Sequence, residues 1–307
     1  MSALLVLAAA AAAVPAQGAV GGGWQLVWSD EFDGERLDPV KWVLADDCWG
    51  GGNEERQCYT PDADNHAVED GLLRVIARRE THTGPAFPLA QRTTPDKRLA
   101  RASKPFTSAR LATAGKAAWR YGRIEIRARL PQGQGTWPAI WMLPEDWSYG
   151  PWASSGEIDI MEAVNLGEPC GGCAGGKEDR VLGTLHFGGP PPRNRFVGEE
   201  TALPEPVEFH VYELEWNAEG MTWRIDGRSY ARRVPHEWHT LASDAPGAPF
   251  DKPFHLILNL AIGGRWPEGS NRMGVDEGGF PKVMDIDWVR VWQQAPAANQ
   301  RGSRYRP

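Results

Sequence analysis

The stretch Trp152-Ala-Ser-Ser-Gly-Glu-Ile-Asp-Ile-Met-Glu-Ala-Val164 sets three acids, Glu157, Asp159 and Glu162, among apolar residues. Ionised carboxylates are seldom tolerated in apolar surroundings without partners. Side chains of a strand alternate between its two faces, so Glu157 and Asp159 share one face and the isoleucines beside them point to the other. The stretch therefore predicts a strand with one acidic face and one face in a hydrophobic core.

Strict alternation would place Met161 on the acidic face and bury Glu162 in the apolar layer. A one-residue β-bulge at Ile160 and Met161 removes this conflict, because two residues then oppose one on the neighbouring strand. Glu162 then returns to the face of Glu157 and Asp159. Bulges of this kind are common beside active sites.

With the bulge, Glu157 and Glu162 are about four strand steps apart, or roughly 13 Å between Cα atoms. Two glutamate side chains that lean together can approach the spacing of about 5 to 5.5 Å between the carboxyl groups of a retaining glycosidase. In that chemistry one carboxylate attacks the anomeric carbon, and the other protonates the leaving oxygen and later activates water. Asp159 would then push the two pKa values apart. From the pattern alone, a solvated face of a strand or helix is the more common interpretation.

The segment 156–163, Gly-Glu-Ile-Asp-Ile-Met-Glu-Ala, resembles the signature of glycoside hydrolase family 16, in the bulged form carried by laminarinases, agarases and carrageenases. The other blocks favour the laminarinase-like branch. The similarity extends over about residues 24–292. Further blocks that resemble the family, in the same order, are residues 28–33, 53–60, 107–110, 119–123, 134–143, 184–188, 259–264 and 287–289.

This resemblance implies a fold, a two-sheet antiparallel β-sandwich of the β-jelly-roll, concanavalin A-like type with a concave substrate cleft. The sequence independently indicates an all-β fold, because short strands recur with turn signals between them and helical periodicity is scarce. The expected strands cover residues 24–32, 72–78, 107–111, 121–130, 181–187, 211–216, 222–225, 228–232, 254–262 and 284–292. Residues 80–105 are rich in Pro, Thr and Arg without periodicity, which predicts a surface loop.

The chain has 307 residues, a net charge of −7 and fifteen tryptophans. The acidic balance argues against a nucleic-acid or anionic-membrane partner, and we expect a monomer whose partner is a polysaccharide. Some tryptophans must fill the core. The others are suited to stacking on sugar rings.

The composition of the two ends of the chain predicts a signal peptide and a disordered tail. Residues 1–18 are apolar and alanine-rich and end in small residues, which predicts a signal peptide and a secreted, extracellular or periplasmic protein, although no basic residue precedes Arg36. A single catalytic domain is expected over residues 22–293. Residues 294–307 are expected to form a disordered tail.

Four cysteines allow three disulfide pairings that the sequence cannot separate. In an exported protein the local pairs, Cys48 with Cys58 and Cys170 with Cys173, are favoured. The alternatives for the second pair are redox chemistry or a zinc site. Neither a thioredoxin-like context nor a second C-x-x-C motif supports them.

The resemblance assigns roles to individual residues. Glu157 is the expected nucleophile, Glu162 the acid/base and Asp159 the residue that tunes the pair. The expected sugar contacts, in decreasing order of support, are Trp137, Trp141, Trp119, Arg110, Asn53 and His186. The block around Asn53 matches the family only in part, because Glu54, Arg56 and Cys58 depart from it.

No organic cofactor is implied. Family members often carry a structural calcium ion held partly by backbone oxygens, and the residues that resemble that site are Glu31, Gly71 and Asp287. The sequence thus predicts an endo-β-glucanase that cleaves β-1,3 linkages of laminarin-type glucans with retention. Two alternatives stay open: a family 16 hydrolase of another polysaccharide, such as mixed-linkage glucan, agar or carrageenan, and a non-catalytic β-glucan-binding protein.

Overall fold

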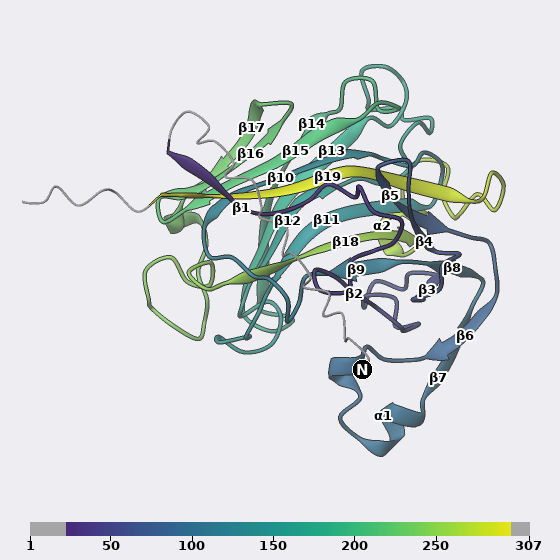
Figure 1. Ribbon diagram of the computed structural model, residues 1–307, viewed down its shortest axis with the longest axis horizontal. Helices are drawn as coiled ribbons and strands as arrows, with labels where there is room; N and C mark the ends of the chain where they lie inside the picture. Colours follow the sequence, from purple (N-terminus) through teal and green to yellow (C-terminus); the bar gives the residue numbers. More distant parts are fainter. Residues whose placement is uncertain (1–22, 296–307) are drawn as a thin grey trace, which may run out of the picture.

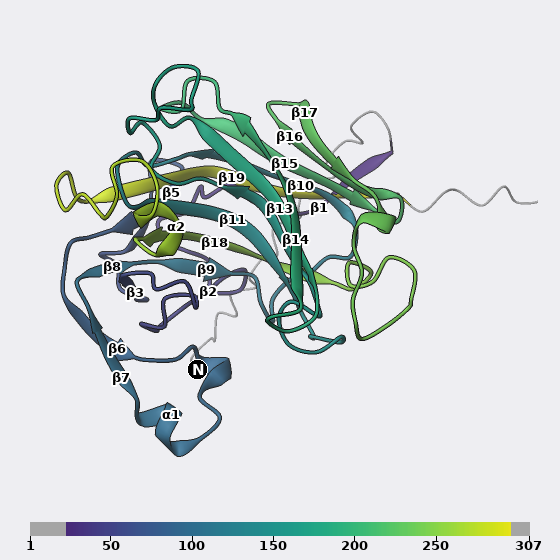
Figure 2. The same ribbon diagram turned by 180° about the vertical axis from the view of Figure 1, so that it is seen from behind.

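The structure, a computed structural model, describes residues 23–295. The predicted signal peptide and nearly all of the predicted C-terminal tail lie outside these residues. The regular structure of the described chain is mainly antiparallel strands, most of which form two large sheets lying face to face (Figures 1 and 2). This arrangement confirms the predicted all-β sandwich.

The first sheet has eight strands and includes the last strand of the chain, β19 (Lys282–Gln294). β1 (Trp24–Asp30) and β5 (Leu72–Ala77) pair with successive parts of β19, and β10 (Gly122–Arg129) pairs along its other edge. The remaining strands are β4 (His66–Glu69), β15 (His210–Asn217), β16 (Gly220–Ile225) and β17 (Arg228–Arg233). The short turn between β16 and β17 contains Asp226 and Gly227, both with positive φ, as a tight hairpin requires.

The second sheet has seven strands and contains β12 (Glu157–Glu162), the strand of the three acids. Its strands, in spatial order, are β14 (Asn194–Ala202), β13 (Arg180–Gly188), β12, β11 (Thr136–Pro144), β18 (Phe254–Ile262), β9 (Arg110–Ala112) and β2 (Val43–Leu44). β12 is thus flanked on both sides, which fixes the direction of its side chains.

The hydrophobic core lies between the two sheets. Alternate residues of β10, such as Ile124 and Ile126, are fully buried, while the arginines and glutamate between them are half-buried. On the second sheet, Ile158 and Met142 point into the same core. Packing one face of the second sheet in this way leaves its opposite face available for polar and aromatic side chains.

The segment predicted as a featureless surface loop, residues 80–105, is instead an ordered arm. It contains the hairpin of β6 (His82–Pro85) and β7 (Arg101–Lys104), with η1 (Leu89–Gln91) and α1 (Pro95–Leu99) at its tip. Figures 1 and 2 show the arm projecting from the sandwich. Of these elements, only α1 is marked in the sequence by residues typical of a helix start. Thr94 caps its first turn, and Pro95 occupies its first position.

One strand prediction needs correction, and one long strand was missed. The predicted strand 107–111 is divided at Ala109 into β8 (Phe106–Ser108), which pairs with β3 (Gln57–Tyr59), and β9 of the second sheet. β14 was not predicted at all. It is an edge strand with few buried residues, so its sequence carries little hydrophobic alternation.

Both favoured disulfides are present, Cys48 with Cys58 and Cys170 with Cys173. The first ties the loop before β3 to that strand, beside the base of the arm. The second closes a turn in the loop between β12 and β13. Because every cysteine is paired, the structure gives no support to a zinc site at the C-x-x-C motif.

Candidate active site

β12 contains the predicted bulge. On one side Trp141 pairs with Asp159 and Ile140 with Met161, so Ile160 is the extra residue of the strand. On the other side Asp159 pairs with Thr184, and the register shifts before Glu162 is reached. The bulge confirms the sequence argument, because it brings Glu162 back to the face of Glu157 and Asp159.

The core side of the bulge is held by Trp223 of β16. Its Nε1 donates a hydrogen bond of 2.9 Å to the backbone oxygen of Asp159. A Cβ on Gly183, in the neighbouring strand, would come within 2.4 Å of the Trp223 ring. A glycine at position 183 thus leaves room for the indole. The indole satisfies the Asp159 carbonyl at the point where the bulge interrupts the regular hydrogen bonding of β12.

Two indoles hold the two glutamates from opposite ends of β12. Trp152 Nε1 donates to Glu157 Oε2 at 2.8 Å, and Trp137 Nε1 donates to Glu162 Oε1 at 3.0 Å. Each glutamate therefore keeps one carboxylate oxygen that is not engaged by these donors. This orientation leaves both carboxyl groups able to contact a substrate.

Asp159 lies between the two glutamates on β12, and His186 contacts it from the neighbouring strand β13. The Asp159 side chain is only 3% exposed, and its Oδ2 lies 3.2 Å from Nε2 of His186. That contact lacks hydrogen-bond geometry, so Oδ2 has no hydrogen-bond partner among the described residues. The same nitrogen of His186 lies 3.8 Å from Oε1 of Glu157. His186 is directly opposite Glu157 in the β12–β13 ladder, so its position follows from the register.

The three acids share one electrostatic environment. Burial raises the pKa of Glu157, of Asp159 and of Glu162 to about 8 each. The negative charge of Asp159 raises the pKa of both glutamates further, while the His186 imidazole acts in the opposite direction. Among the described residues, no lysine or arginine forms an ion pair with the three carboxylates. The cluster therefore retains protons at neutral pH and strongly favours added positive charge.

The raised pKa values predict how stability depends on pH. An acid whose pKa is higher in the folded state than in the unfolded chain stabilises the fold at low pH, and this contribution is lost as pH rises from about 4.5 to about 8. We expect Glu157→Gln to raise the melting temperature at pH 8 by several degrees, from about 1 to 3 kcal/mol of relieved repulsion. At pH 5 the variant and the wild type should melt within about a degree of each other.

Differential scanning fluorimetry across this pH range measures the effect, with Glu219→Gln as the control because Glu219 is exposed and forms no ion pair. The melting temperatures of the wild type and of Glu157→Gln could instead fall by the same amount between pH 5 and pH 8. That result would show that ionisation of Glu157 is not coupled to folding.

The expected sugar contacts on β11 and β9 also lie on the acidic face. Trp141 pairs with Asp159, and its Nε1 donates to Asn259 Oδ1 at 2.6 Å. The guanidinium of Arg110 lies 4.7 Å from the centre of the Trp141 ring, in a cation–π contact. Asn259 in turn donates to the hydroxyl of Tyr59. The strands β11, β18 and β9 thus present a continuous polar and aromatic surface beside the acids.

Trp137 continues this surface on the side of Glu162. Trp266, in the short helix α2 (Arg265–Glu268), packs edge-on against it with ring centres 5.4 Å apart. Gly264 lies between Trp137 and the backbone of Asn53, where a Cβ would be only 3.1 Å from the Asn53 oxygen. The backbone of the exposed residue Asn53 is therefore close to Trp137.

The structure corrects the predicted sugar-binding role of Trp119. Its side chain belongs to the hydrophobic core and is 7% exposed, and it packs edge-on against Trp28 at 5.4 Å. Its backbone also pairs with Phe254 in an isolated bridge. Trp119 therefore supports the sandwich from inside and is not placed to contact a sugar in the cleft.

Sequence reasoning missed four residues that the structure adds to the site: Trp152, Asn259, Trp266 and Phe196. Trp152 begins the stretch that carries the acids, but spacing alone does not show that its indole folds back to Glu157. Phe196 is 71% exposed on β14, and its ring centre lies 6.0 Å from that of His186. An exposed aromatic residue next to His186 could be found only after β14 had been placed beside β13.

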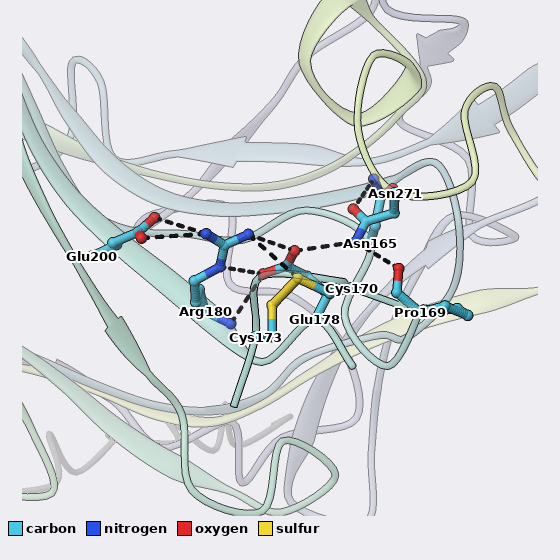
Figure 3. Close-up of a disulfide and its surroundings, with 8 residues drawn as sticks. All are labelled: Asn165, Pro169, Cys170, Cys173, Glu178, Arg180, Glu200 and Asn271. Carbon is cyan, nitrogen blue, oxygen red and sulfur yellow. Dashed lines mark hydrogen bonds and ion pairs between the residues drawn. A yellow bond between two sulfur atoms is a disulfide. The ribbon is translucent and has the colours of Figure 1, made fainter. Parts of the chain in front are cut away.

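The glycine-rich loop between β12 and β13 is anchored near the Glu162 side of the site. Figure 3 shows Arg180 lying between Glu178 and Glu200, beside the disulfide. Glu178 accepts a hydrogen bond from Asn271, and Asn271 accepts one from Asn165. Asn165 is fully buried, three residues after Glu162, and also bonds the carbonyl of Pro267 beside Trp266. The loop and α2 are thereby fixed relative to the end of β12.

Residues 88–290 match the family model described as "Glycosyl hydrolases family 16". The chain belongs to this family. Its laminarinase-like resemblance is confirmed by relatives with more than 35% identity.

A beta-glucanase of Rhodothermus marinus is 41% identical over 279 residues, which cover 88% of this chain and 85% of the relative. Glucan endo-1,3-beta-glucosidase A1 of Niallia circulans is 38% identical over 285 residues, 89% of this chain, but the match spans only 38% of that longer protein. The X-ray structure of a laminarinase from Rhodothermus marinus has 40% identity and a TM-score of 0.71, and it covers 89% of this chain and 98% of that chain. This family 16 chain is thus a glycoside hydrolase with the fold of the laminarinases.

Proposed function

We propose that this family 16 chain is an endo-acting β-1,3-glucanase that hydrolyses laminarin-type glucans with retention of anomeric configuration. The observation that carries the proposal is the bulge in β12, which places Glu157, Asp159 and Glu162 on one face, in contact with Trp152 and Trp137. The names of the relatives, which include a glucan endo-1,3-beta-glucosidase and a laminarinase, supply the substrate class.

In the proposed reaction Glu157 attacks the anomeric carbon while Glu162 donates its proton to the departing glycosidic oxygen. Glu162 then takes a proton from water, which hydrolyses the glycosyl-enzyme and releases Glu157. Contacts of the two glutamates support this division of roles. His186 lies 3.8 Å from Glu157, where a positive imidazole would favour an ionised nucleophile, and no cation of the described chain forms an ion pair with Glu162.

Asp159 is proposed to keep the two glutamates in different protonation states. Its negative charge raises the pKa of both glutamates, so that one of them stays protonated more readily, and the repulsion between Glu157 and Glu162 opposes ionisation of the second after the first has lost its proton. Such a separation is what a nucleophile and a general acid in one site require.

Incubation of the purified protein with laminarin, lichenan, agarose and carrageenan, with reducing ends measured over time, tests the substrate class. We expect the highest rate on laminarin. Faster cleavage of agarose or carrageenan would instead support a hydrolase of another polysaccharide. Binding of laminarin without release of reducing ends would support the non-catalytic alternative, although both glutamates needed for cleavage are in place.

We also propose that the protein acts outside the cytoplasm. Two disulfides in one chain support an oxidising compartment. Within residues 23–295, the structure contains no helix of the length and hydrophobicity needed to span a bilayer.

We also propose a structural calcium ion at Glu31, Gly71 and Asp287. β1 ends opposite Val289 of β19, and β5 begins its pairing with β19 at Ile286, so Asp287 lies between the two pairings. Glu31 directly follows β1 and Gly71 directly precedes β5. The carboxylate of Glu31 is engaged by Arg290 and that of Asp287 by Arg127. Backbone oxygens are therefore the donors that could hold calcium in this arrangement.

Removal of calcium should lower the melting temperature if the ion is bound. At a free concentration of about 100 times Kd, a ligand adds about 2.7 kcal/mol of stability, which corresponds to several degrees. Thermal melting with EDTA, and then with excess calcium or excess magnesium, provides the measurement. Restoration by calcium alone is the expected result, and an unchanged melting temperature in EDTA would exclude the site.

A further inference from the structure

The Glu157, Asp159 and His186 side chains converge on one point. One ligand atom from each, a carboxylate oxygen or a ring nitrogen, lies within 4.8 Å of the others. Two of the contacts are shorter, 3.2 Å between Asp159 Oδ2 and His186 Nε2 and 3.8 Å between Glu157 Oε1 and the same nitrogen. Ligand atoms at such separations can all reach one small cation with bonds of about 2.0 to 2.2 Å after small side-chain rotations.

A second, independent observation concerns the bonding of Asp159. Its Oδ2 is buried and lacks a hydrogen-bond partner, although buried carboxylate oxygens are nearly always satisfied. That oxygen is also the one that faces His186. An unsatisfied oxygen turned toward two further donor atoms is suited to receive a positively charged group.

The charge of the surroundings favours the same kind of ligand. Three carboxylates are gathered without a lysine or arginine in ion-pair contact among the described residues. In the proposed reaction this negative field stabilises the positive charge that develops on the sugar in the oxocarbenium-like transition state. When no glucan is bound, a metal cation can replace the protons that these carboxylates retain at neutral pH.

We propose that Glu157, Asp159 and His186 form an inhibitory site for a divalent zinc ion, which occupies the cleft in place of the glucan. Imidazole nitrogen with two carboxylates, and an open fourth position for water, is a donor set that zinc accepts and that magnesium and calcium do not prefer. Zinc bound there covers the nucleophile Glu157. Zinc and glucan therefore exclude each other, so inhibition is competitive.

Isothermal titration of the zinc-free protein with zinc chloride, in a calcium-containing buffer without glucan, tests the site directly. We expect one zinc ion per chain for the wild type and affinity at least about tenfold lower for His186→Gln. His236→Gln is the matched control, because His236 is exposed in η2 (Pro235–Glu237), away from β12, and should bind zinc as the wild type does. Magnesium chloride in place of zinc should give no comparable heat.

Initial rates on laminarin at several zinc concentrations give the second readout. An apparent KM that rises with zinc at constant kcat, and that EDTA reverses, is the expected pattern. Equal zinc affinity in wild type and His186→Gln would show that zinc binds elsewhere and overturn the proposal, as would zinc inhibition that lowers kcat alone. The titration is independent of the proposed function, because it requires no turnover, so a protein that fails to cleave laminarin could still confirm the metal site.

Discussion

Replacement of Glu157 by glutamine is expected to lower kcat on laminarin by about 10⁴-fold or more, because an amide cannot form the glycosyl-enzyme bond. The substitution keeps the size of the side chain. Its amide oxygen can still accept the hydrogen bond that Trp152 donates at 2.8 Å. It also removes a negative charge from a cluster whose members repel one another, so folding should be preserved at pH 8 and above.

Kinetics on laminarin and thermal melting of the same preparations test this expectation. Glu219→Gln serves as the control, since Glu219 is exposed on the turn between β15 and β16 and should leave kcat unchanged. A Glu157→Gln variant that is folded and retains more than a few per cent of wild-type turnover would remove Glu157 from the role of nucleophile.

Replacement of Glu162 by glutamine should produce the second largest loss, and the loss should depend on the leaving group. General acid–base catalysis contributes about 10² to 10⁴-fold, and the contribution is greatest when the departing oxygen is strongly basic. On laminarin, whose leaving group is a sugar hydroxyl, we expect a loss of about 10³-fold or more. On an aryl β-glucoside oligomer with an acidic phenol as leaving group, formation of the glycosyl-enzyme should be much less affected.

Pre-steady-state release of the phenol from the aryl substrate separates the two glutamates. Glu162→Gln should give a rapid burst followed by slow turnover, because the intermediate forms without acid assistance but water is no longer activated. Glu157→Gln should give no burst. If both variants lost the burst equally, Glu162 could not be assigned as the acid/base. Trp137→Phe, which removes the donor to Glu162, should change the pH dependence of the remaining activity more than the burst itself.

Local alternation in the sequence predicted most of the longer strands. β18 coincides with the predicted strand 254–262, and β10 with its alternating arginines and isoleucines differs from the prediction by one residue at each end. The bulge in β12 was predictable for a physical reason. Without it Glu162 would enter a layer that contains Ile158 and Ile160, and burial of an unpaired carboxylate there is too costly.

Features that depend on distant contacts were not predictable in the same way. The fifteen tryptophans carry no local mark that separates the core residue Trp119 from the cleft residues Trp137 and Trp141. The arm at residues 80–105 has no hydrophobic period because it packs few side chains into the core. The bonds that Asn165 forms to Asn271 and Pro267 join segments about a hundred residues apart, so only the folded chain shows how the loop and α2 are fixed beside Glu162.

The anomeric configuration of the first product tests most directly whether the three acids on β12 act as a double-displacement site. Proton NMR of laminarin hydrolysis, recorded within the first minutes and before mutarotation, distinguishes the two anomers at the new reducing end. A retaining mechanism through Glu157 and Glu162 predicts that the β-anomer appears first and that the α-anomer follows by mutarotation. Initial appearance of the α-anomer would contradict a covalent intermediate on Glu157 and with it the roles assigned to both glutamates.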